Sequence, residues 1–338
     1  MTCLHDGGLT RSDVTDESQQ ARVGSSSRSI LGSARIPEEL AACMGSGAAP
    51  GVGRVSRLTT EWDAHRRAVF GVAYRLLGSV ADAEDVTQDV WLRASGTDLE
   101  QVEDLRAWLV TVSARRAYDI LKSARVRREA YVGPWLPEPL MTGPDASEPV
   151  LIDESVSSAM LLVMDELSPA ERVAFVLHDV FELKFGSIAE LLGITVATTR
   201  QHASRARRRV AKARGNSSQS SPTERARLLA TFKAAYEAGD LAGLVRLLHP
   251  DVVYVTDGGG KALAMRKPVF GGQRVAEVMV RVGRQWRPDR IDLVEVGGEL
   301  ALKFYREGRV YSVDTVQITD GQISEYRRVI NPDKLEHV

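Results

Sequence analysis

The chain has 338 residues, of which 43% are hydrophobic and 26% are charged, and its formal net charge is -1. This length predicts two or three small domains, and no stretch approaches the ~18 apolar residues that a membrane span needs. The two cysteines, Cys3 and Cys43, cannot build a disulfide framework or a cysteine-ligated zinc site, and the N-terminus lacks the apolar core of a secretory signal. The cytoplasm is therefore the expected compartment, with no membrane contact.

The charged residues are segregated along the chain. Residues 82–104 contain eight acidic side chains and one basic one, whereas residues 106–128 contain seven basic side chains and one acidic one. Residues 200–214 contain seven further basic side chains and no acidic one. Two separate basic blocks indicate two contacts with a polyanion, and the acidic block indicates a basic protein partner.

Hydrophobic periodicity predicts a helical unit over residues 57–128, preceded by a disordered tail over residues 1–56 that is rich in glycine and serine. Helices are expected at residues 62–77, 80–94 and 104–122. In the second helix, Ala83, Val86 and Val90 form the core face, and acidic side chains form the face beside it. The third helix carries its basic residues toward its C-terminal end.

Residues 129–152 are predicted to form an extended linker, because closely spaced prolines are incompatible with a helix. Within it, Trp135-Leu136-Pro137-Glu138-Pro139 holds an aromatic and an aliphatic side chain in a stiff frame. Two interpretations stay open. The segment is either a plain spacer or a docking segment that covers the tryptophan.

Residues 153–214 are predicted to form a second helical unit that ends in a helix-turn-helix. Ser168, Pro169 and Glu171 have the spacing of a capping box with proline at the first helical position. A short helix over residues 185–192, a turn at Gly193 and a long helix over residues 196–212 follow. The predicted buried face of the long helix consists of small residues, namely Val196, Thr199, Ala203, Ala206 and Val210. Its opposite face can donate to phosphates and base edges through Thr198, Arg200, Gln201, His202, Arg205 and Arg209.

A flexible joint over residues 215–222 precedes a predicted α+β domain over residues 223–338. Helices are expected at residues 223–238, 241–248 and 273–285. After Pro250 the hydrophobic period changes to two, which predicts strands at residues 252–256, 290–296, 300–306, 310–318 and 323–330. Helices followed by a curved antiparallel sheet would form a cone whose mouth can hold a small molecule.

The segment DAEDVTQDVW at residues 82–91, followed by Arg106-Ala107-Trp108-Leu109 and the basic helix end, resembles region 2 of the extracytoplasmic-function (ECF) sigma factors. Residues 167–212 resemble their region 4. The resemblance implies all-α sigma regions that bind core RNA polymerase, through the β′ clamp and the β flap, and that recognise promoter DNA. By position it places Asp82, Asp85, Gln88 and Asp89 at the polymerase contact. It places Arg115, Arg116, Asp119 and Lys122 near minus 10 DNA, and Thr198, Arg200, Gln201, His202 and Arg205 at minus 35 DNA.

The linker motif and more than one hundred additional residues depart from that family in general, and they resemble its subgroup with a fused SnoaL-like (NTF2-like) domain. Two further marks of the subgroup are present, DGGGK at residues 257–261 and NPDKL at residues 331–335. The resemblance implies regulation in cis by this domain, with a small-molecule ligand in the cone as an open alternative. The implied interdomain contacts are Trp135, Leu136, Pro137, Asp257, Lys261, Asn331, Asp333 and Lys334. Three adjacent glycines also predict a loop whose backbone approaches another surface closely.

Three classes of function remain to be separated: a polymerase sigma subunit, a helix-turn-helix regulator that binds DNA unaided, and a polyketide-cyclase-like enzyme with a DNA-binding appendage. Side chains that could act as a general base are present, namely His249, Asp257, Tyr305, Asp314 and Tyr326, but no acid/base pair has a recognisable spacing. The acidic ridge over residues 82–89 favours the sigma factor, because a repressor has no need of it. No enzymatic activity, cofactor or metal is expected.

Overall fold

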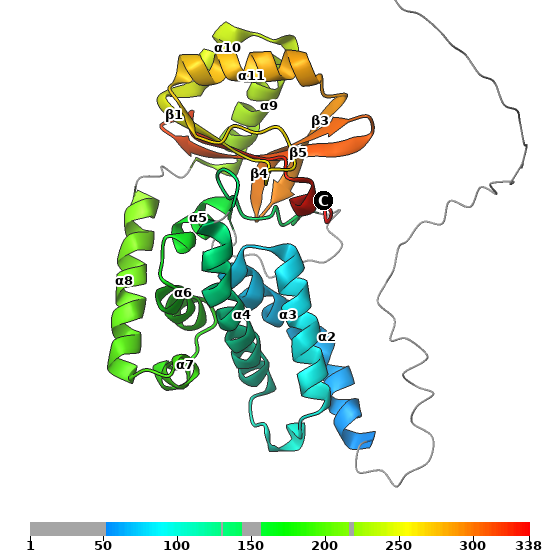
Figure 1. Cartoon of the computed structure of the whole chain (residues 1–338), viewed down its shortest axis with the longest axis vertical. Helices are drawn as coiled ribbons and strands as arrows, with labels where there is room; N and C mark the ends of the chain where they lie inside the picture. The colour runs from blue at the N-terminus through cyan, green and yellow to red at the C-terminus, as the bar shows by residue number, and fades with distance from the viewer. Residues whose placement is uncertain (1–51, 130, 144–156, 216–219) are drawn as a thin grey trace, which may run out of the picture. The chain divides into compact units, whose positions relative to one another are not determined.

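A computed structural model describes residues 52–129, 131–143, 157–215 and 220–338. The predicted tail up to residue 51, the helix start around Ile152 and Val156, and the joint at residues 216–219 lie outside the described residues. Among the described helices, none is long and apolar enough to cross a bilayer. Figure 1 shows the helices of the N-terminal part and the sheet that follows them.

The first helical unit consists of α2 (Val52–Leu77), α3 (Val80–Ser95) and α4 (Leu105–Glu129), with a short 3-10 turn, η1 (Leu99–Gln101), before α4. α2 begins at Val52, so residues 52–56 are helical where disorder was predicted. α4 continues past Lys122 through the basic run at residues 125–128. Ser79 caps α3, because its hydroxyl accepts a hydrogen bond from the amide of Asp82 at 3.1 Å.

The second helical unit consists of α5 (Ser158–Asp165), α6 (Pro169–Phe175), a π-helical turn η3 (Val176–Val180), α7 (Phe185–Leu192) and α8 (Val196–Gly215). The capping box of Ser168 and Glu171 is present, and Gly193 ends α7 with φ +67°. On α8, Thr199, Ala203, Ala206 and Val210 are buried as predicted. The prediction for Val196 is wrong, since its side chain is 37% exposed. Periodicity gives the direction of a side chain, but at the first residue of a helix it does not supply a neighbour to cover it.

The C-terminal domain is a curved six-stranded sheet in the order β2-β1-β6-β5-β4-β3, in which only β1 and β6 are parallel. Its strands are β1 (Leu248–Asp257), β2 (Val269–Phe270), β3 (Arg290–Val296), β4 (Glu299–Arg306), β5 (Arg309–Thr319) and β6 (Gln322–Val329). Its helices are α9 (Pro222–Ala238), α10 (Leu241–Leu247) and α11 (Gly272–Trp286). The three helices cover one face of the sheet (Figure 1). Helices on one face of a curved, largely antiparallel sheet confirm the predicted α+β fold; the two-residue β2 was not predicted.

The opposite face of the sheet is also covered, by residues of the linker and of the C-terminal end. A second apolar cluster joins Leu136 of the linker and Leu335 to strand residues Val296, Val313 and Val329. A short 3-10 turn, η4 (Pro332–Lys334), follows β6 and holds the NPDKL segment beside this cluster. The linker is therefore part of the fold of the C-terminal domain, which positions the site described next.

Candidate functional site

The acidic ridge lies on α3 and meets the basic face of α4. Asp82, Asp85 and Asp89 line an open groove of about 470 Å³ together with Arg116 of α4. Arg116 Nε donates to Asp89 Oδ2 at 2.8 Å, so the predicted polymerase contact and the predicted minus 10 contact share an ion pair. Gln88 is exposed on the same helix. The two surfaces are one continuous charged region.

The remaining minus 10 candidates form a row along α4. Arg115, Asp119 and Lys122 are exposed. Lys122 Nζ lies 3.5 Å from Asp119 Oδ1 and 3.9 Å from the centre of the Tyr118 ring. The stacked ring holds the exposed ammonium in place, which gives this part of α4 a positive charge for a phosphate.

Only some of the residues predicted to contact minus 35 DNA are exposed on the helix-turn-helix. Arg200, Gln201 and Arg205 are exposed, whereas Thr198 and His202 are half-buried. The Thr198 hydroxyl lies 2.8 Å from the hydroxyl of Thr195, which caps α8. Thr198 is therefore engaged in the helix start.

Two arginines of α8 attach the helix to the rest of its unit. Arg209 Nη1 donates to Glu171 at 3.0 Å, and Arg207 Nε donates to Asp179 at 2.6 Å. The sequence grouped Arg209 with the DNA-reading face of α8, and this grouping stays a prediction: its head group pairs with the capping box of α6, while its side chain is 52% exposed. Burial alone would raise the pKa of Glu171, but hydrogen bonds from Ser168 and the charge of Arg209 outweigh it and leave that pKa below its usual value.

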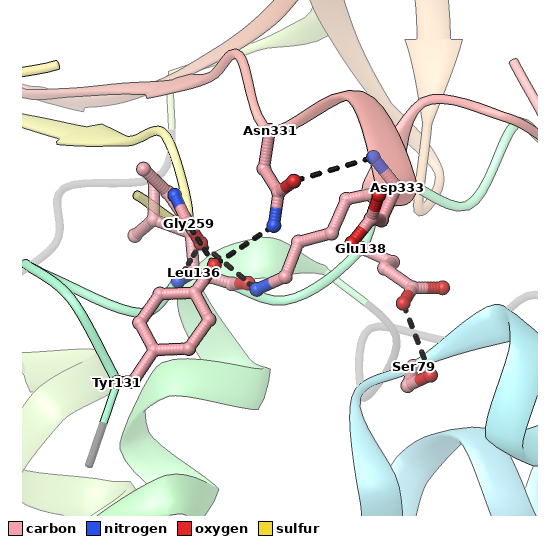
Figure 2. Close-up of polar contacts among 9 residues, drawn as sticks. Ser79, Tyr131, Leu136, Glu138, Gly259, Asn331 and Asp333 are labelled. Atoms are coloured by element: carbon pink, nitrogen blue, oxygen red, sulfur yellow. Dashed lines mark hydrogen bonds and ion pairs between the residues drawn. The ribbon is translucent and has the colours of Figure 1, made fainter. Parts of the chain in front are cut away.

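The linker and the C-terminal domain meet at Asp257, the last residue of β1. The carboxylate is fully buried and accepts hydrogen bonds from the Tyr131 hydroxyl at 2.6 Å and from the Leu136 amide at 2.8 Å. Lys334 Nζ lies 2.8 Å from the same carboxylate and also donates to the Leu136 carbonyl. Asn331 donates to the Tyr131 hydroxyl at 2.9 Å (Figure 2). The DGGGK and NPDKL segments thus bind the same short piece of linker, and we call this group of contacts the linker latch.

The glycines of the DGGGK segment allow the close approach that the sequence predicted. Gly259 has φ +59°, and a Cβ on it would lie 2.3 Å from the Asn331 amide nitrogen. A Cβ on Gly260 would lie 3.2 Å from the Val132 side chain. Lys261 forms an exposed ion pair with Asp333 at 2.6 Å on the rim of the latch. Any side chain in place of Gly259 would push this loop away from Asn331 and the linker.

The linker is also bound by the first helical unit, through a residue that the sequence did not single out. Glu138 accepts a hydrogen bond from the Val80 amide at 2.6 Å. It also accepts one from the Ser79 hydroxyl at 3.0 Å (Figure 2). Tyr74 donates to the Glu138 carbonyl at 2.8 Å, and burial raises the pKa of Tyr74 well above its usual value, with the Glu138 charge adding to the rise. The Glu138 carboxylate therefore satisfies the first free amides of α3.

The linker continues from Glu138 to the edge of the sheet. The Thr142 amide donates to the Glu295 carbonyl at 3.0 Å, and the Gly297 amide donates to the Leu140 carbonyl at 2.8 Å. These contacts extend the sheet beyond β3.

Trp135 lies between the two domains. Lys334 Nζ lies 4.2 Å from the centre of its ring, and a Cβ on Gly78 would lie 2.9 Å from the ring. Pro137 is likewise close to Gly78.

Sequence reasoning missed Tyr131, Tyr74 and Glu138. Only Glu138 had a usable signal, since a lone carboxylate inside the apolar Trp135–Pro139 motif needs a donor once the motif is buried. The candidates for a general base are scattered: Asp257 is in the latch, His249 Nδ1 accepts from the Asp251 amide, and Arg290 covers the Tyr305 ring. Asp314 and Tyr326 are together inside the cone, where the tyrosine hydroxyl donates to the carboxylate at 2.6 Å.

Comparison with known families supplies the class of the protein. The sigma-70 region 2 model matches residues 62–127, and the sigma-70 region 4 model matches residues 157–210. These two matches cover the acidic ridge, the basic face of α4 and the helix-turn-helix. The helical part of the chain is that of a sigma factor.

Individual relatives extend the similarity through the C-terminal domain. The ECF RNA polymerase sigma factor SigJ of Mycobacterium tuberculosis is 38% identical over 289 residues, which cover 81% of this chain and 92% of SigJ. The probable ECF RNA polymerase sigma factor SigI of the same species is 30% identical over 284 residues, which cover 82% of this chain and 95% of SigI. The crystal structure of M. tuberculosis SigJ matches with a TM-score of 0.68 and 36% identity, covering 82% of this chain and 98% of that one. The chain belongs to the ECF RNA polymerase sigma factors, which direct promoter-specific initiation by core polymerase.

Proposed function

We propose that the C-terminal domain regulates this sigma factor in cis by holding the linker against region 2. The observation that carries the proposal is that both the C-terminal domain and region 2 form hydrogen bonds with residues 131–142. Asp257 and Lys334 bind the linker from the C-terminal domain, while Tyr74 and the first amides of α3 bind Glu138 from region 2. Because α3 carries the acidic ridge, docking or release of the linker would affect the helix that faces polymerase.

The surfaces described above support specific contacts. In the proposal, Asp82, Asp85, Gln88 and Asp89 bind the β′ clamp, and region 4 binds the β flap. Arg115, Arg116, Asp119 and Lys122 contact minus 10 DNA, and Arg200, Gln201, His202 and Arg205 contact minus 35 DNA, with Thr198 supporting the helix start. A phosphate at Arg116 would compete with Asp89 for the guanidinium, so DNA and polymerase binding would be coupled through that pair.

The protein acts in the cytoplasm together with polymerase and performs no catalysis. Of the side chains considered as general bases, Asp257 is committed to the latch and His249 to a backbone amide. A small molecule in the cone would act by changing the stability of the docked linker. Such a ligand shifts the equilibrium between docked and open forms only by its difference in affinity for the two.

Run-off transcription with core polymerase tests the proposal. Trp135→Ala and removal of residues 223–338 should each change promoter activity, and together they should change it by less than the sum of the two effects, because both remove the same docking. Phe270→Ala, which removes an aromatic that is 63% exposed and lies away from the latch, is the control and should leave activity unchanged. Strictly additive effects of the first two changes would show that the linker and the C-terminal domain act separately.

A further inference from the structure

The face of the sheet that packs against α9, α10 and α11 carries a buried charged pair that the latch does not use. Asp314 on β5 and Arg328 on β6 are cross-strand neighbours on this face. Arg328 Nε donates to Asp314 Oδ2 at 2.6 Å, and the Tyr326 hydroxyl donates to the same oxygen at 2.6 Å. Asp314 is 0% exposed and Arg328 is 2% exposed.

The same group contains polar atoms without partners. In the described part of the chain, Asp314 Oδ1, Arg328 Nη1 and Ser312 Oγ are buried and form no hydrogen bond. Buried polar atoms in folded proteins are nearly always satisfied, by protein, water or ligand. These three atoms, one donor, one acceptor and one hydroxyl on adjacent strands, leave hydrogen-bonding capacity that a water or a polar ligand group could satisfy.

The backbone next to this place is irregular. The pairing of β4 with β5 shifts between Phe304 opposite Ser312 and Tyr305 opposite Val310, so Tyr311 has no cross-strand partner. Bulges of this kind commonly aim side chains into binding sites. Tyr311 packs at the edge of the helix-covered core, half-buried, and stacks on Trp286 of α11 at 5.9 Å. Tyr311 precedes Ser312 in this irregular part of β5.

The charges at the site limit what can bind. The Asp314 and Arg328 charges cancel, and burial followed by the nearby Asp314 charge raises the pKa of Tyr326 so that it stays neutral. An ionic ligand would therefore leave a net charge buried, which is costly. A neutral group is needed that accepts from Arg328 Nη1 and donates to Asp314 Oδ1. A primary carboxamide offers both functions on adjacent atoms, and the rings of Phe304 and Tyr236, 4.7 and 5.7 Å from the guanidinium, suit an aromatic carrier.

We propose that the cone binds a neutral aromatic carboxamide, or a compound with the same adjacent acceptor and donor, at Ser312, Asp314 and Arg328. The proposal deepens the regulation in cis described above and rests on it for its biological meaning, although the site itself is defined by the atoms of the cone alone. Ser312 is the specificity residue that can be changed most safely, because its hydroxyl has no protein partner to lose.

Titration calorimetry of the full chain with benzamide, without polymerase or DNA, tests the site. Benzamide should bind saturably below about 10 mM and at least ~10-fold more tightly than benzoate, which has the same ring and a negative charge. Ser312→Ala should weaken benzamide binding by ~5-fold or more. It should leave the thermal stability of the unliganded chain unchanged or raised, because an unsatisfied buried hydroxyl is removed.

Ser324→Ala is the matched control, because that hydroxyl on β6 already bonds Thr319 and Gln317. It should lower thermal stability and leave benzamide binding unchanged. Three results would each overturn the proposal: no saturable binding of benzamide, equal binding of benzoate, or equal binding of benzamide by the Ser312→Ala chain. If benzamide does not bind, a water is left as the occupant of the site. These measurements do not involve the linker, so a negative result is distinguishable from a failure of regulation in cis, which the transcription assay reports.

Discussion

Asp257 is the residue on which the linker and the C-terminal segment converge. Its buried carboxylate accepts from Tyr131 and Leu136 and balances the charge of Lys334, whose side chain is 7% exposed. Asp257→Asn should lower the free energy of unfolding by about 3 kcal/mol, because a buried ammonium is left without its counter-charge. Urea denaturation measures this change.

The matched control for Asp257 is Asp333, which forms the exposed ion pair of the same latch. Asp333→Asn removes a carboxylate paired with Lys261, and both side chains are more than half exposed. Its cost should stay below about 1 kcal/mol, because water screens exposed pairs. Equal losses from the two substitutions would show that burial of Asp257 contributes nothing.

Gly259 offers a test of close backbone approach. Gly259→Ala adds a methyl group that collides with Asn331, at a residue whose φ is +59°. Gly308→Ala is the control, because Gly308 has φ +71° and nothing within 4 Å of the added Cβ. The control should cost about 1 kcal/mol from backbone strain alone. Gly259→Ala should cost clearly more and should expose the linker to limited proteolysis, and similar cleavage of both variants would contradict the close contact.

At the scale of elements, α3 carries the proposed polymerase contact on a face that does not support the core. Asp85 is exposed, while Ala83, Val86 and Val90 are buried. Asp85→Arg should reduce retention of core polymerase in a pull-down by more than 10-fold, since a repulsive charge replaces an attractive one. Thermal unfolding should hardly change.

Asp89→Arg should add to the effect of Asp85→Arg, and it also removes the exposed pair with Arg116, at a stability cost below about 1 kcal/mol. Glu100→Arg makes the same change of charge at an exposed position outside the groove. It should leave polymerase binding intact. Equal losses from Glu100→Arg and Asp85→Arg would mean that only net charge matters.

The contact between α6 and α8 predicts a dependence on pH. The folded-state pKa of Glu171 is below its ordinary value of 4.5, so the unfolded chain takes up the proton more readily. The stability from this carboxylate is therefore present above pH 4.5 and is lost as the pH falls through the lower, folded pKa. Glu171→Gln should lower stability at pH 7 and flatten the acid limb of a stability profile measured by denaturant titration.

Glu224 provides the comparison for Glu171, because it closes the same kind of capping box with Ser221 at the start of α9. The pKa of Glu224 is also lowered, chiefly by the hydrogen bond from the Ser221 amide. Its carboxylate is on the surface and lacks the pairing with an α8 arginine. Glu224→Gln should therefore flatten the acid limb less than Glu171→Gln does. The reverse order would show that Arg209 does not hold α8 to α6.

At the scale of the whole molecule, the linker connects the C-terminal domain to region 2. If the latch holds Glu138 in place, Asp257→Asn should speed hydrogen exchange of the α3 amides of Val80 and Ala81, which donate to Glu138 at 2.6 and 3.2 Å. The amides in the middle of α3 should be unaffected. A change confined to residues 248–338 would show that the latch is not coupled to region 2.

The local signals in this sequence were reliable where a few neighbouring residues decide the outcome. The capping box at Ser168, the turn at Gly193 and the bounds of β3 are as predicted, because caps, turns and strand alternation depend on residues within a few positions of one another. Errors arose at helix ends: α2 starts earlier and Val196 is exposed.

By itself the sequence determined the succession of helices and strands, the segregation of charge that points to polymerase and DNA, and the motifs that meet in the latch. The tertiary structure decided which side chains meet. Tyr131 and Asp257 are 126 residues apart in the chain, and Tyr131 and Asn331 are 200 residues apart. The attachment of Glu138 to α3 and the unpartnered atoms around Arg328 also appear only in the folded chain. Periodicity fixes the face on which a side chain lies, but its partner across such distances depends on how whole elements pack.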